Sequence, residues 1–489
     1  MTDSNSSLPD VHHFIDGQRT ASLDGASFQS FDPETDQPLA VVAKASSEDV
    51  RLAVDAAQRA FSVVRAASPS VRERLLTAAA SALQKRRDTI IDRLVREIGS
   101  PIGKANLEMK IAAETLQATA GIPRRMTGKT FAADTPMSED RTPALSYSVR
   151  VPLGVTAAIT PFNVPLVKGV KHASMGLATG NSVVWLPSPE TAWIADAVAD
   201  VFAEALETVD LPGGAFNVIH GEGSQIGDAL VCDRRVKAVG FTGSTRTGRH
   251  VQAACGSHGK RVTLELGGKN PLIVLEGAEI PAAVRAAVLG GFLYQGQICM
   301  STSRIIVAES IAESFRERLV AAVSEVGRGA LMDPATMIGP IIHADARKRI
   351  HVHLSDALRH GAKVVCGGQW TGNRLNPTIL EGVTDEMRMA NEETFGPVVS
   401  LEVARDDEQA LELVAGGPSM LVASVFTRRI DNALRFAEAI PSAMVHFNDM
   451  TIRQQAEVPF GGEGESGFGR EGLETGIDDF TRWKWVTIR

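Results

Sequence analysis

The stretch "VKAVGFTGSTRTGRHV", residues 236–251, joins a β-rich run to a helical run through a short turn. Its first residues predict a buried strand and its last residues predict a helix. Gly243 and Ser244 lie in the turn, where backbone N–H groups at a helix N-terminus can bind a phosphate. The turn is not a Walker A loop, because Arg249 and His250 replace the required lysine and serine or threonine, and it lacks GxGxxG. On this stretch alone, a plain strand-to-helix turn is an equal alternative.

The same order of strand and helix continues on both sides of this stretch. Strand-like runs occur at "GVTAAIT", "SVVWLP" and "AFNVIHG", and the helical run "TAWIADAVADVFAEAL" separates two of them. A second alternating series, from about 265 to 460, contains "NPLIVL", "STSRIIVA", "AKVVCGG" and "SMLVASVFT". Strands that alternate with helices predict parallel sheets covered by helices. For a chain of 489 residues, the sequence therefore predicts an α/β protein with more than one domain.

Two regions do not follow this rhythm. Residues 47–120 predict helices, because "SSEDVRLAVDAAQRAF" opens with serine capping signals and the next segment has apolar residues at three- and four-residue steps. The segments "ALSYSVRVP" (144–152) and "RWKWVTIR" (482–489) alternate with a period of two, which predicts strands. A strand at the end of a chain needs a partner edge, which another subunit can supply.

The composition excludes several classes of function. A net charge of −8 and the lack of a basic run argue against nucleic acid binding. The N-terminus has no leader-like apolar region, and no apolar run reaches the roughly 18 residues of a membrane span, so we expect a cytoplasmic protein. The four cysteines are scattered without a CxxC pair, and HExxH is absent, so we expect no metal site. The pair His351 and His353 fits a solvated helix face better than metal ligands.

The stretch "QGQICMSTS", residues 295–303, places Cys299 among small polar residues. A cysteine is most often a small buried hydrophobe. The other three cysteines lie in helix- or strand-like runs, whereas Cys299 lies in a polar loop that contains glycine. A helix that began just after Cys299 would favour the thiolate through its positive end. We therefore interpret Cys299 as a nucleophile.

Two further polar residues follow predicted strands. Glu265, in "TLELGGKNP", meets a glycine pair, where a movable carboxylate can act as a general base, although an ordinary solvated glutamate is the alternative. Asn163, in "ITPFNVP", lies between two prolines, and its amide can donate to a developing oxyanion, although a turn-forming asparagine is the alternative.

These segments together resemble the aldehyde dehydrogenase superfamily over nearly the whole chain. The motifs that carry the resemblance are, in order, "PLGVTAAITPFNVP", "GLATGNSVVW", "GFTGSTRTGR", "VTLELGGKNP", "GQICMSTSR", "NEETFGPV", "PFGGEGESGFGREG" and "FTRWKWVTIR". The resemblance implies NAD(P)-dependent oxidation of an aldehyde to a carboxylic acid. Cys299 would form a thiohemiacetal whose oxyanion is held by Asn163, and water activated by Glu265 would hydrolyse the resulting thioester.

The resemblance also implies residues that hold the cofactor. Those near the pyrophosphate and nicotinamide are Thr160, Pro161, Phe162, Gly243, Ser244, Gly267, Glu393 and Phe395. Glu471 matches an acid behind the active site, and Lys269 matches a lysine to which we assign only a structural role. The implied partners are a small aldehyde and further copies of the chain, in a homodimer or homotetramer.

The implied architecture is the aldehyde dehydrogenase fold. It comprises a Rossmann-like cofactor-binding domain from 1–127 and 151–264, an α/β catalytic domain from 265–460, and a small β oligomerisation element from 128–150 and 461–489.

Two departures from the family pattern, and one charged helical segment, limit these inferences. "GNSVVWLPSPE" has Leu186 and Pro189 where a lysine and a glutamate usually contact the adenosine ribose, so both NAD and NADP stay open and we favour NAD. The loop before "SGFGR" has Glu463, Gly464 and Glu465 where the family usually has a lysine, and we expect this change to affect oligomer contacts or the pocket mouth. Lys168, Lys171 and His172 follow Asn163 on a predicted helix, and a solvated surface face is favoured over contact with an anionic substrate group.

The motifs near Cys299 and at the C-terminus are most similar to dehydrogenases of aromatic aldehydes, such as benzaldehyde, vanillin and salicylaldehyde. A CoA-acylating relative is an alternative, but such relatives generally lack the glutamate found here as Glu265. A non-catalytic relative that kept the fold is a second alternative, against which Cys299, Glu265 and Asn163 argue.

Overall fold

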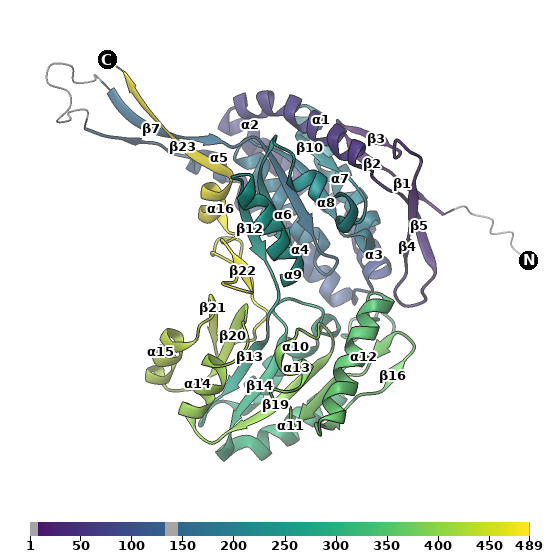
Figure 1. Cartoon of the computed structure of the whole chain (residues 1–489), viewed down its shortest axis with the longest axis vertical. Coiled ribbons are helices and arrows are strands. Elements are labelled where there is room, and N and C mark those ends of the chain that lie inside the picture. Colours follow the sequence, from purple (N-terminus) through teal and green to yellow (C-terminus); the bar gives the residue numbers. More distant parts are fainter. Residues whose placement is uncertain (1–7, 133–144, 489) are drawn as a thin grey trace, which may run out of the picture.

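The computed structural model describes residues 8–132 and 145–488, and it contains two large sheets, one above the other in Figure 1. The upper, eight-stranded sheet has the order β22-β12-β11-β8-β9-β10-β2-β3. Its strands are β2 (His13–Ile15), β3 (Gln18–Thr20), β8 (Val155–Thr160), β9 (Ser182–Pro187), β10 (Phe216–Val218), β11 (Val236–Thr242), β12 (Arg261–Glu265) and β22 (Gly467–Phe468).

The central strands of this sheet, β8 to β12, are all parallel. From β8 the chain adds β9 and β10 on one side, and then β11 and β12 on the other. The order therefore reverses between β8 and β11, and the loops that leave these two strands diverge. In such sheets a ligand crevice lies at the carboxyl ends of the strands, beside the reversal.

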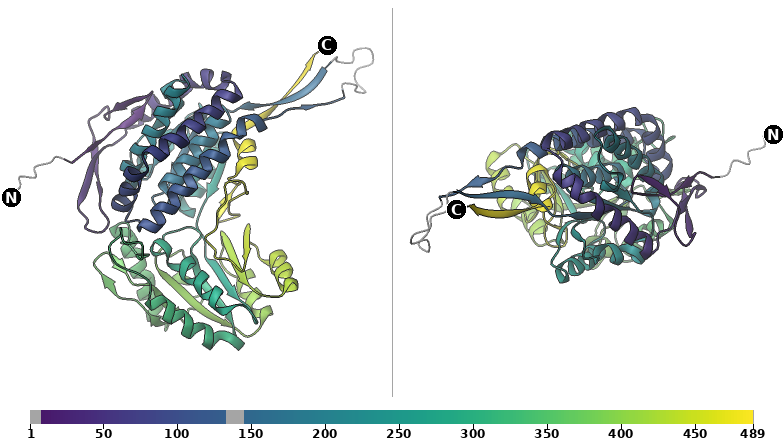
Figure 2. Two further views of the ribbon diagram at one scale, coloured as in Figure 1. Left: turned by 180° about the vertical axis from the view of Figure 1, so that it is seen from behind. Right: turned by 90° about the horizontal axis from the view of Figure 1, so that it is seen from above.

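Helices cover both faces of the upper sheet. On one face lie α1 (Ser47–Ala66), α8 (Gly223–Val231) and α9 (Thr245–Ser257). On the other lie α6 (Pro165–Ala178) and α7 (Ala192–Thr208), with an outer layer of α2 (Pro69–Lys85), α3 (Arg87–Ile98) and α4 (Ile102–Ala120), followed by the short α5 (Ile122–Arg125). Figure 2 shows the outer helices from behind. Each face buries its own apolar cluster, so the sheet is enclosed as predicted.

The second sheet, below in Figure 1, has seven strands in the order β15-β18-β19-β14-β13-β20-β21. Its strands are β13 (Asn270–Val274), β14 (Thr302–Ala308), β15 (Lys363–Cys366), β18 (Thr378–Glu381), β19 (Val398–Ala404), β20 (Val422–Phe426) and β21 (Met444–Phe447). One face packs on α10 (Ile280–Phe292) and α11 (Ala312–Ser324), and the other on α14 (Asp407–Ala415) and α15 (Ile430–Ala439). Near its edge lie α12 (Ala344–Arg359), α13 (Arg388–Asn391), β16 (Trp370–Thr371) and β17 (Arg374–Leu375).

The predicted strand at the C-terminus forms and finds its partner within the chain. β23 (Thr481–Ile488) pairs antiparallel with β7 (Leu145–Pro152), which also pairs with β6 (Lys129–Thr130). These strands extend from the body as an arm, next to α16 (Leu473–Phe480) (Figures 1 and 2). Residues 133–144, which fall within the predicted oligomerisation element, lie outside the described residues. At the opposite end, β1 (Asp10–Val11), β4 (Ser27–Phe31) and β5 (Pro38–Ala43) form a small sheet.

Local sequence signals explain several of these boundaries. The Ser46 side chain accepts a hydrogen bond from the N–H of Asp49, and the Asp49 carboxylate accepts from the N–H of Ser46, so α1 begins with a capping box. α3 ends at Gly99, whose φ of 61° suits glycine at a helix end. α9 begins directly after Ser244, as predicted. None of the helices within 8–132 and 145–488 is long and apolar enough to span a membrane.

Candidate active site

A cavity of about 720 Å³ opens at the carboxyl ends of the parallel strands, beside the reversal of strand order. Asn163 and Gly243 lie in the loops after β8 and β11, and Glu265 is the last residue of β12. Cys299 reaches the cavity from the loop before β14, in the second sheet. Because parallel strands all end at the same edge, residues far apart in the chain meet there. The candidate nucleophile, base and amide donor thus share one cavity.

The loop before Cys299 has a strained backbone. Tyr294 and Gln295 have φ angles of 52° and 44°, which side chains other than glycine rarely adopt. Buried hydrogen bonds hold this shape: the Tyr294 hydroxyl donates to the Ile98 carbonyl (2.8 Å), and the Gln295 amide donates to the Pro340 carbonyl (2.6 Å). Such strain persists where the surroundings over-determine it, and here it sets the direction in which Cys299 leaves the loop.

No helix begins just after Cys299, so the thiolate is not favoured by a helix terminus there. The chain makes a turn and enters β14 at Thr302, because the Asn270 side-chain amide donates to the carbonyls of Cys299 (2.8 Å) and Ser301 (3.0 Å). Burial raises the pKa of the Cys299 thiol to about 12, although the nearby Lys168 ammonium opposes this shift. Without a helix terminus behind it, the thiol is protonated at neutral pH and needs a proton acceptor before it can attack.

Glu265 is the last residue of β12, and its side chain is only 2% exposed. Neither carboxylate oxygen accepts a hydrogen bond from the described residues. Burial, and after it the neighbouring Glu471 carboxylate, raise the pKa of Glu265 to about 8, although the Lys168 and Lys171 ammonium groups oppose the shift. The solvated-glutamate alternative is therefore wrong, and the free oxygens in the cavity suit a group that takes a proton from water.

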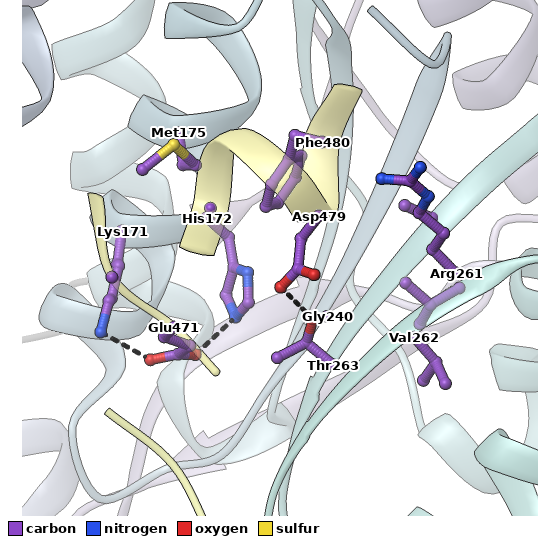
Figure 3. Close-up of a pocket in the computed structure, with 14 residues that line it drawn as sticks. Lys171, His172, Met175, Gly240, Arg261, Val262, Thr263, Glu471, Asp479 and Phe480 are labelled. Atoms are coloured by element: carbon purple, nitrogen blue, oxygen red, sulfur yellow. Dashed lines mark hydrogen bonds and ion pairs between the residues drawn. The ribbon is translucent and has the colours of Figure 1, made fainter. Parts of the chain in front are cut away.

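Behind Glu265 lies a buried cluster around Glu471, part of which Figure 3 shows. The ammonium groups of Lys168 and Lys171 lie 2.8 Å and 2.7 Å from the Glu471 carboxylate, and the His172 imidazole lies 3.5 Å from it. Burial alone would raise the pKa of Glu471, but the two lysines lower it well below its ordinary value. Burial lowers the pKa of His172 to about 4, so this imidazole is neutral.

The surface-face interpretation of Lys168, Lys171 and His172 was wrong. Every residue of α6 is buried, because the helix lies between the upper sheet, α4 and α16. The three side chains meet Glu471 from the C-terminal segment, which is distant in sequence. Because α6 is buried on all sides, its lysines lie in the interior of the protein and need a buried counter-charge, which Glu471 supplies.

Most of the predicted cofactor residues line the cavity. They are Phe162, Gly243, Ser244, Gly267, Glu393 and Phe395, whereas Thr160 and Pro161 are absent from the described lining. The Thr160 hydroxyl instead accepts a hydrogen bond from the Trp185 indole (2.8 Å). Gly267 has no room for a side chain, because a Cβ there would collide with the Glu393 carboxylate. The rings of Phe162 and Phe395 meet edge to face, with centroids 5.9 Å apart.

Several other lining residues could not be predicted from the sequence motifs. They are Arg246, His343, Arg349, Asn391 and Glu392, together with Glu465 from the segment expected to affect the pocket mouth.

The interpretation of His351 and His353 as a solvated helix face was wrong for His353. Its ring is buried and lies within hydrogen-bond distance of the Thr394 hydroxyl (3.1 Å) and the Glu392 carboxylate (3.2 Å), whereas His351 is exposed.

Comparison with known proteins identifies the family. Residues 20–486 match the model of the aldehyde dehydrogenase family. Vanillin dehydrogenase from Pseudomonas fluorescens is 36% identical over 483 residues, which cover 98% of each chain. The chain belongs to the aldehyde dehydrogenase family. The resemblance carried by the sequence motifs is therefore confirmed.

Solved aldehyde dehydrogenases share the whole fold. The crystal structure of a salicylaldehyde dehydrogenase from Pseudomonas putida G7, complexed with salicylaldehyde, has a TM-score of 0.91 at 33% identity and covers 98% of both chains. A betaine aldehyde dehydrogenase from Staphylococcus aureus in complex with NAD+ has a TM-score of 0.92 at 29% identity, covering 98% of this chain and 94% of that chain. The predicted aldehyde dehydrogenase fold is confirmed.

This aldehyde dehydrogenase has a second cavity, of about 410 Å³, beside the Cys299 loop. Ile298 and Met300, the two neighbours of Cys299, line it. Its other apolar lining residues are Leu107, Ile111, Val164, Val167, Leu293, Met450 and Ile452. Cys299 is thus flanked by a large polar cavity and a smaller cavity with a mostly apolar wall.

Proposed function

We propose that this aldehyde dehydrogenase oxidises an aromatic aldehyde to the carboxylic acid, with a nicotinamide cofactor and with Cys299 as nucleophile. The observation that carries the proposal is the meeting of Cys299, Glu265 and Asn163 at one cavity. Two of the relatives named above, the vanillin dehydrogenase and the salicylaldehyde dehydrogenase complexed with salicylaldehyde, are named for aldehydes with an aromatic ring, which supports this substrate class.

Each of these residues has a distinct role in the proposal. The Cys299 thiol loses its proton to water in the open cavity, and its sulfur then attacks the aldehyde carbon. The oxyanion of the thiohemiacetal accepts hydrogen bonds from the Asn163 amide and the Cys299 N–H. A bound nicotinamide cofactor supplies the hydride acceptor with which the thiohemiacetal becomes a thioester. Glu265 then takes a proton from water, which hydrolyses the thioester and releases the acid.

The cofactor fits the larger cavity. α9 starts at the cavity wall with Thr245 and Arg246, and the first N–H groups of a helix have no partner inside it, so they can bind a pyrophosphate. The Glu393 carboxylate, which packs against Gly267 in the cavity wall, would accept hydrogen bonds from ribose hydroxyl groups. The related betaine aldehyde dehydrogenase structure is a complex with NAD+, which supports this assignment.

We expect NAD to be preferred over NADP. Leu186 is buried and Pro189 is uncharged, so neither supplies the cation that a 2′-phosphate needs. The expected preference is about fivefold in kcat/KM, equivalent to about 1 kcal/mol. Initial rates with each cofactor on one aldehyde measure it, and an equal or higher kcat/KM with NADP would contradict it.

The smaller cavity favours a neutral aldehyde with an apolar body. Each of its cations already faces a carboxylate: Lys104 pairs with Glu108, Lys110 with Glu114 and Arg453 with Asp449. We expect benzaldehyde-type substrates to exceed a carboxylate-bearing semialdehyde by about tenfold or more in kcat/KM, because an anion would have to compete with these carboxylates.

A panel of aldehydes with NAD, with and without coenzyme A, tests this proposal. Acid formation from the aromatic aldehydes without coenzyme A is the expected result, because Glu265 lies in the cavity to activate water. An obligatory requirement for coenzyme A would show that the thioester is resolved by a thiol, and inactivity with all aldehydes would refute the proposed function.

The pH dependence of turnover should follow Glu265. Because its pKa is raised to about 8 and the carboxylate form is the base, thioester hydrolysis should accelerate as the pH rises through about 8. Glu471→Gln removes a negative charge and leaves Lys168 and Lys171, so the pKa of Glu265 should fall and the acid limb should move down by about one pH unit.

Profiles of kcat against pH for the wild type and Glu471→Gln measure this shift. Glu474→Gln is the control, because Glu474 follows closely in sequence but is exposed and pairs with Arg125. An acid limb that stays in place in Glu471→Gln would show that the buried cluster does not set the pKa of Glu265.

A further inference from the structure

Lys104 and Glu108 form a buried ion pair on α4 that the proposed mechanism does not use. They are four residues apart on one face of the helix and are 3% and 2% exposed. A buried ion pair is costly to desolvate and seldom stabilises a protein more than matched apolar side chains would. The contacts of the two side chains indicate why α4 carries a charged pair here.

The ion pair holds the backbone that carries Asn163. The Lys104 ammonium donates to the Asn163 carbonyl (2.7 Å). The Glu108 carboxylate accepts from the N–H groups of Leu166 (2.9 Å) and Val167 (3.3 Å), in the first turn of α6.

α6 needs this carboxylate because it has no cap of its own. The residue before the helix is Val164, which has no side-chain acceptor, and the first helical residue is Pro165, which has no N–H. Glu108 therefore caps α6 from a neighbouring helix, directly after the turn that presents Asn163. The direction of the Asn163 side chain depends on this turn.

The same ammonium also touches the loop that carries Cys299. Lys104 Nζ lies 4.4 Å from the centre of the Tyr294 ring, a cation–π contact. Tyr294 has the left-handed φ of 52° and is tied by its hydroxyl to Ile98. One buried group thus links the Asn163 turn to the strained loop before Cys299.

We propose that Lys104 and Glu108 are positioning residues that set the Asn163 amide against Cys299, so that the oxyanion meets a donor already in place. The inference rests on the proposed function, because it assigns Asn163 to the oxyanion. Donors of this kind act through preorganisation, and a displacement of about 1 Å can reduce the rate about 100-fold. In this role the pair acts through the Asn163 turn and not by contact with the reacting atoms.

The double variant Lys104→Met, Glu108→Gln tests the inference. Replacing both charges by neutral side chains of similar size avoids an unpaired buried charge, and glutamine keeps an acceptor for the α6 amides, so the variant should fold. The matched control is Asp92→Asn, Arg96→Met on α3. Asp92 and Arg96 are also four residues apart, but they are exposed, and their charged groups lie 3.7 Å from each other. Arg96 likewise lies over an aromatic ring, 5.1 Å from the centre of the Trp193 ring.

Rapid mixing with NAD and an aromatic aldehyde measures the first burst of reduced cofactor, and hydrolysis of an activated ester measures acylation without hydride transfer. In the double variant we expect both rates to fall about ten- to hundredfold. The Kd for NAD should stay within about twofold of wild type, because the two residues line the smaller cavity and not the larger one. The α3 control should match the wild type throughout.

Three results would overturn the inference. The first is a burst rate within about twofold of wild type in a variant that binds NAD, and the second is an effect confined to the KM for aldehyde. The third is loss of NAD binding both in the double variant and in Glu108→Gln alone, which would assign the pair to folding. Failure of the proposed function looks different, because the wild type and the α3 control would then also form no reduced cofactor.

Discussion

Replacing Cys299 by alanine is expected to abolish the formation of reduced cofactor, with a fall in kcat of about 10⁴-fold or more. In the proposed mechanism the sulfur is the protein atom that bonds to the aldehyde carbon, and neither Glu265 nor Asn163 takes that role. Alanine leaves a small space in a cavity that is already open, so the fold should persist. Steady-state rates with NAD and an aromatic aldehyde measure the loss.

Cys366→Ala is the matched control for this prediction. Cys366 is also a half-buried free thiol, but it lies on β15 away from the cavity. It should keep wild-type turnover, and both variants should bind NAD as the wild type does. Residual turnover of Cys299→Ala above about a hundredth of the wild-type rate would contradict a covalent route through this residue.

Glu265→Gln is expected to separate the two halves of the reaction. Glutamine has nearly the same size but cannot take a proton, so the thioester should form and then persist. The expected result is one burst of reduced cofactor per active site, followed by a steady-state rate lower by about 10²- to 10⁴-fold. Rapid mixing resolves the burst from the slow phase.

Glu97→Gln controls for the loss of a buried carboxylate. Burial raises the pKa of Glu97 to about 8, as in Glu265, but Glu97 accepts hydrogen bonds from the N–H groups of Trp193 (2.7 Å) and Ile194 (2.8 Å), at the start of α7. It should lose stability without losing turnover. A Glu265→Gln enzyme with a wild-type steady-state rate would remove Glu265 from the activation of water.

The sequence predicted those features that depend on neighbouring residues. The strand and helix around Gly243 follow from β-branched residues, a glycine turn and a serine cap, and the structure has them at β11 and α9. The sequence also allows the prediction that Asn163, Glu265 and the Gly243 turn lie close together. Each lies at the end of a predicted parallel strand, and such strands end at one edge of the sheet. The motif order then connected Cys299 with them.

The sequence did not predict features set by contacts between distant segments. Lys168 and Lys171 have the spacing of an exposed helix face, and only the packing of Glu471 from the C-terminal segment makes them a buried cluster. The turn after Cys299 depends on the amide of Asn270, which lies on another strand. The link from Lys104 to the Asn163 carbonyl joins α4 to the turn before α6, and no local pattern encodes this contact.

The central claim is that the aldehyde carbon becomes bonded to Cys299, and mass spectrometry of Glu265→Gln tests it most directly. The variant would be mixed with NAD and an aromatic aldehyde, quenched in acid during the slow phase, and digested. We predict that the peptide containing Cys299 carries the mass of the acyl group, and that the peptides containing Cys232, Cys255 and Cys366 do not. Formation of reduced cofactor with an unmodified Cys299 peptide would contradict the account.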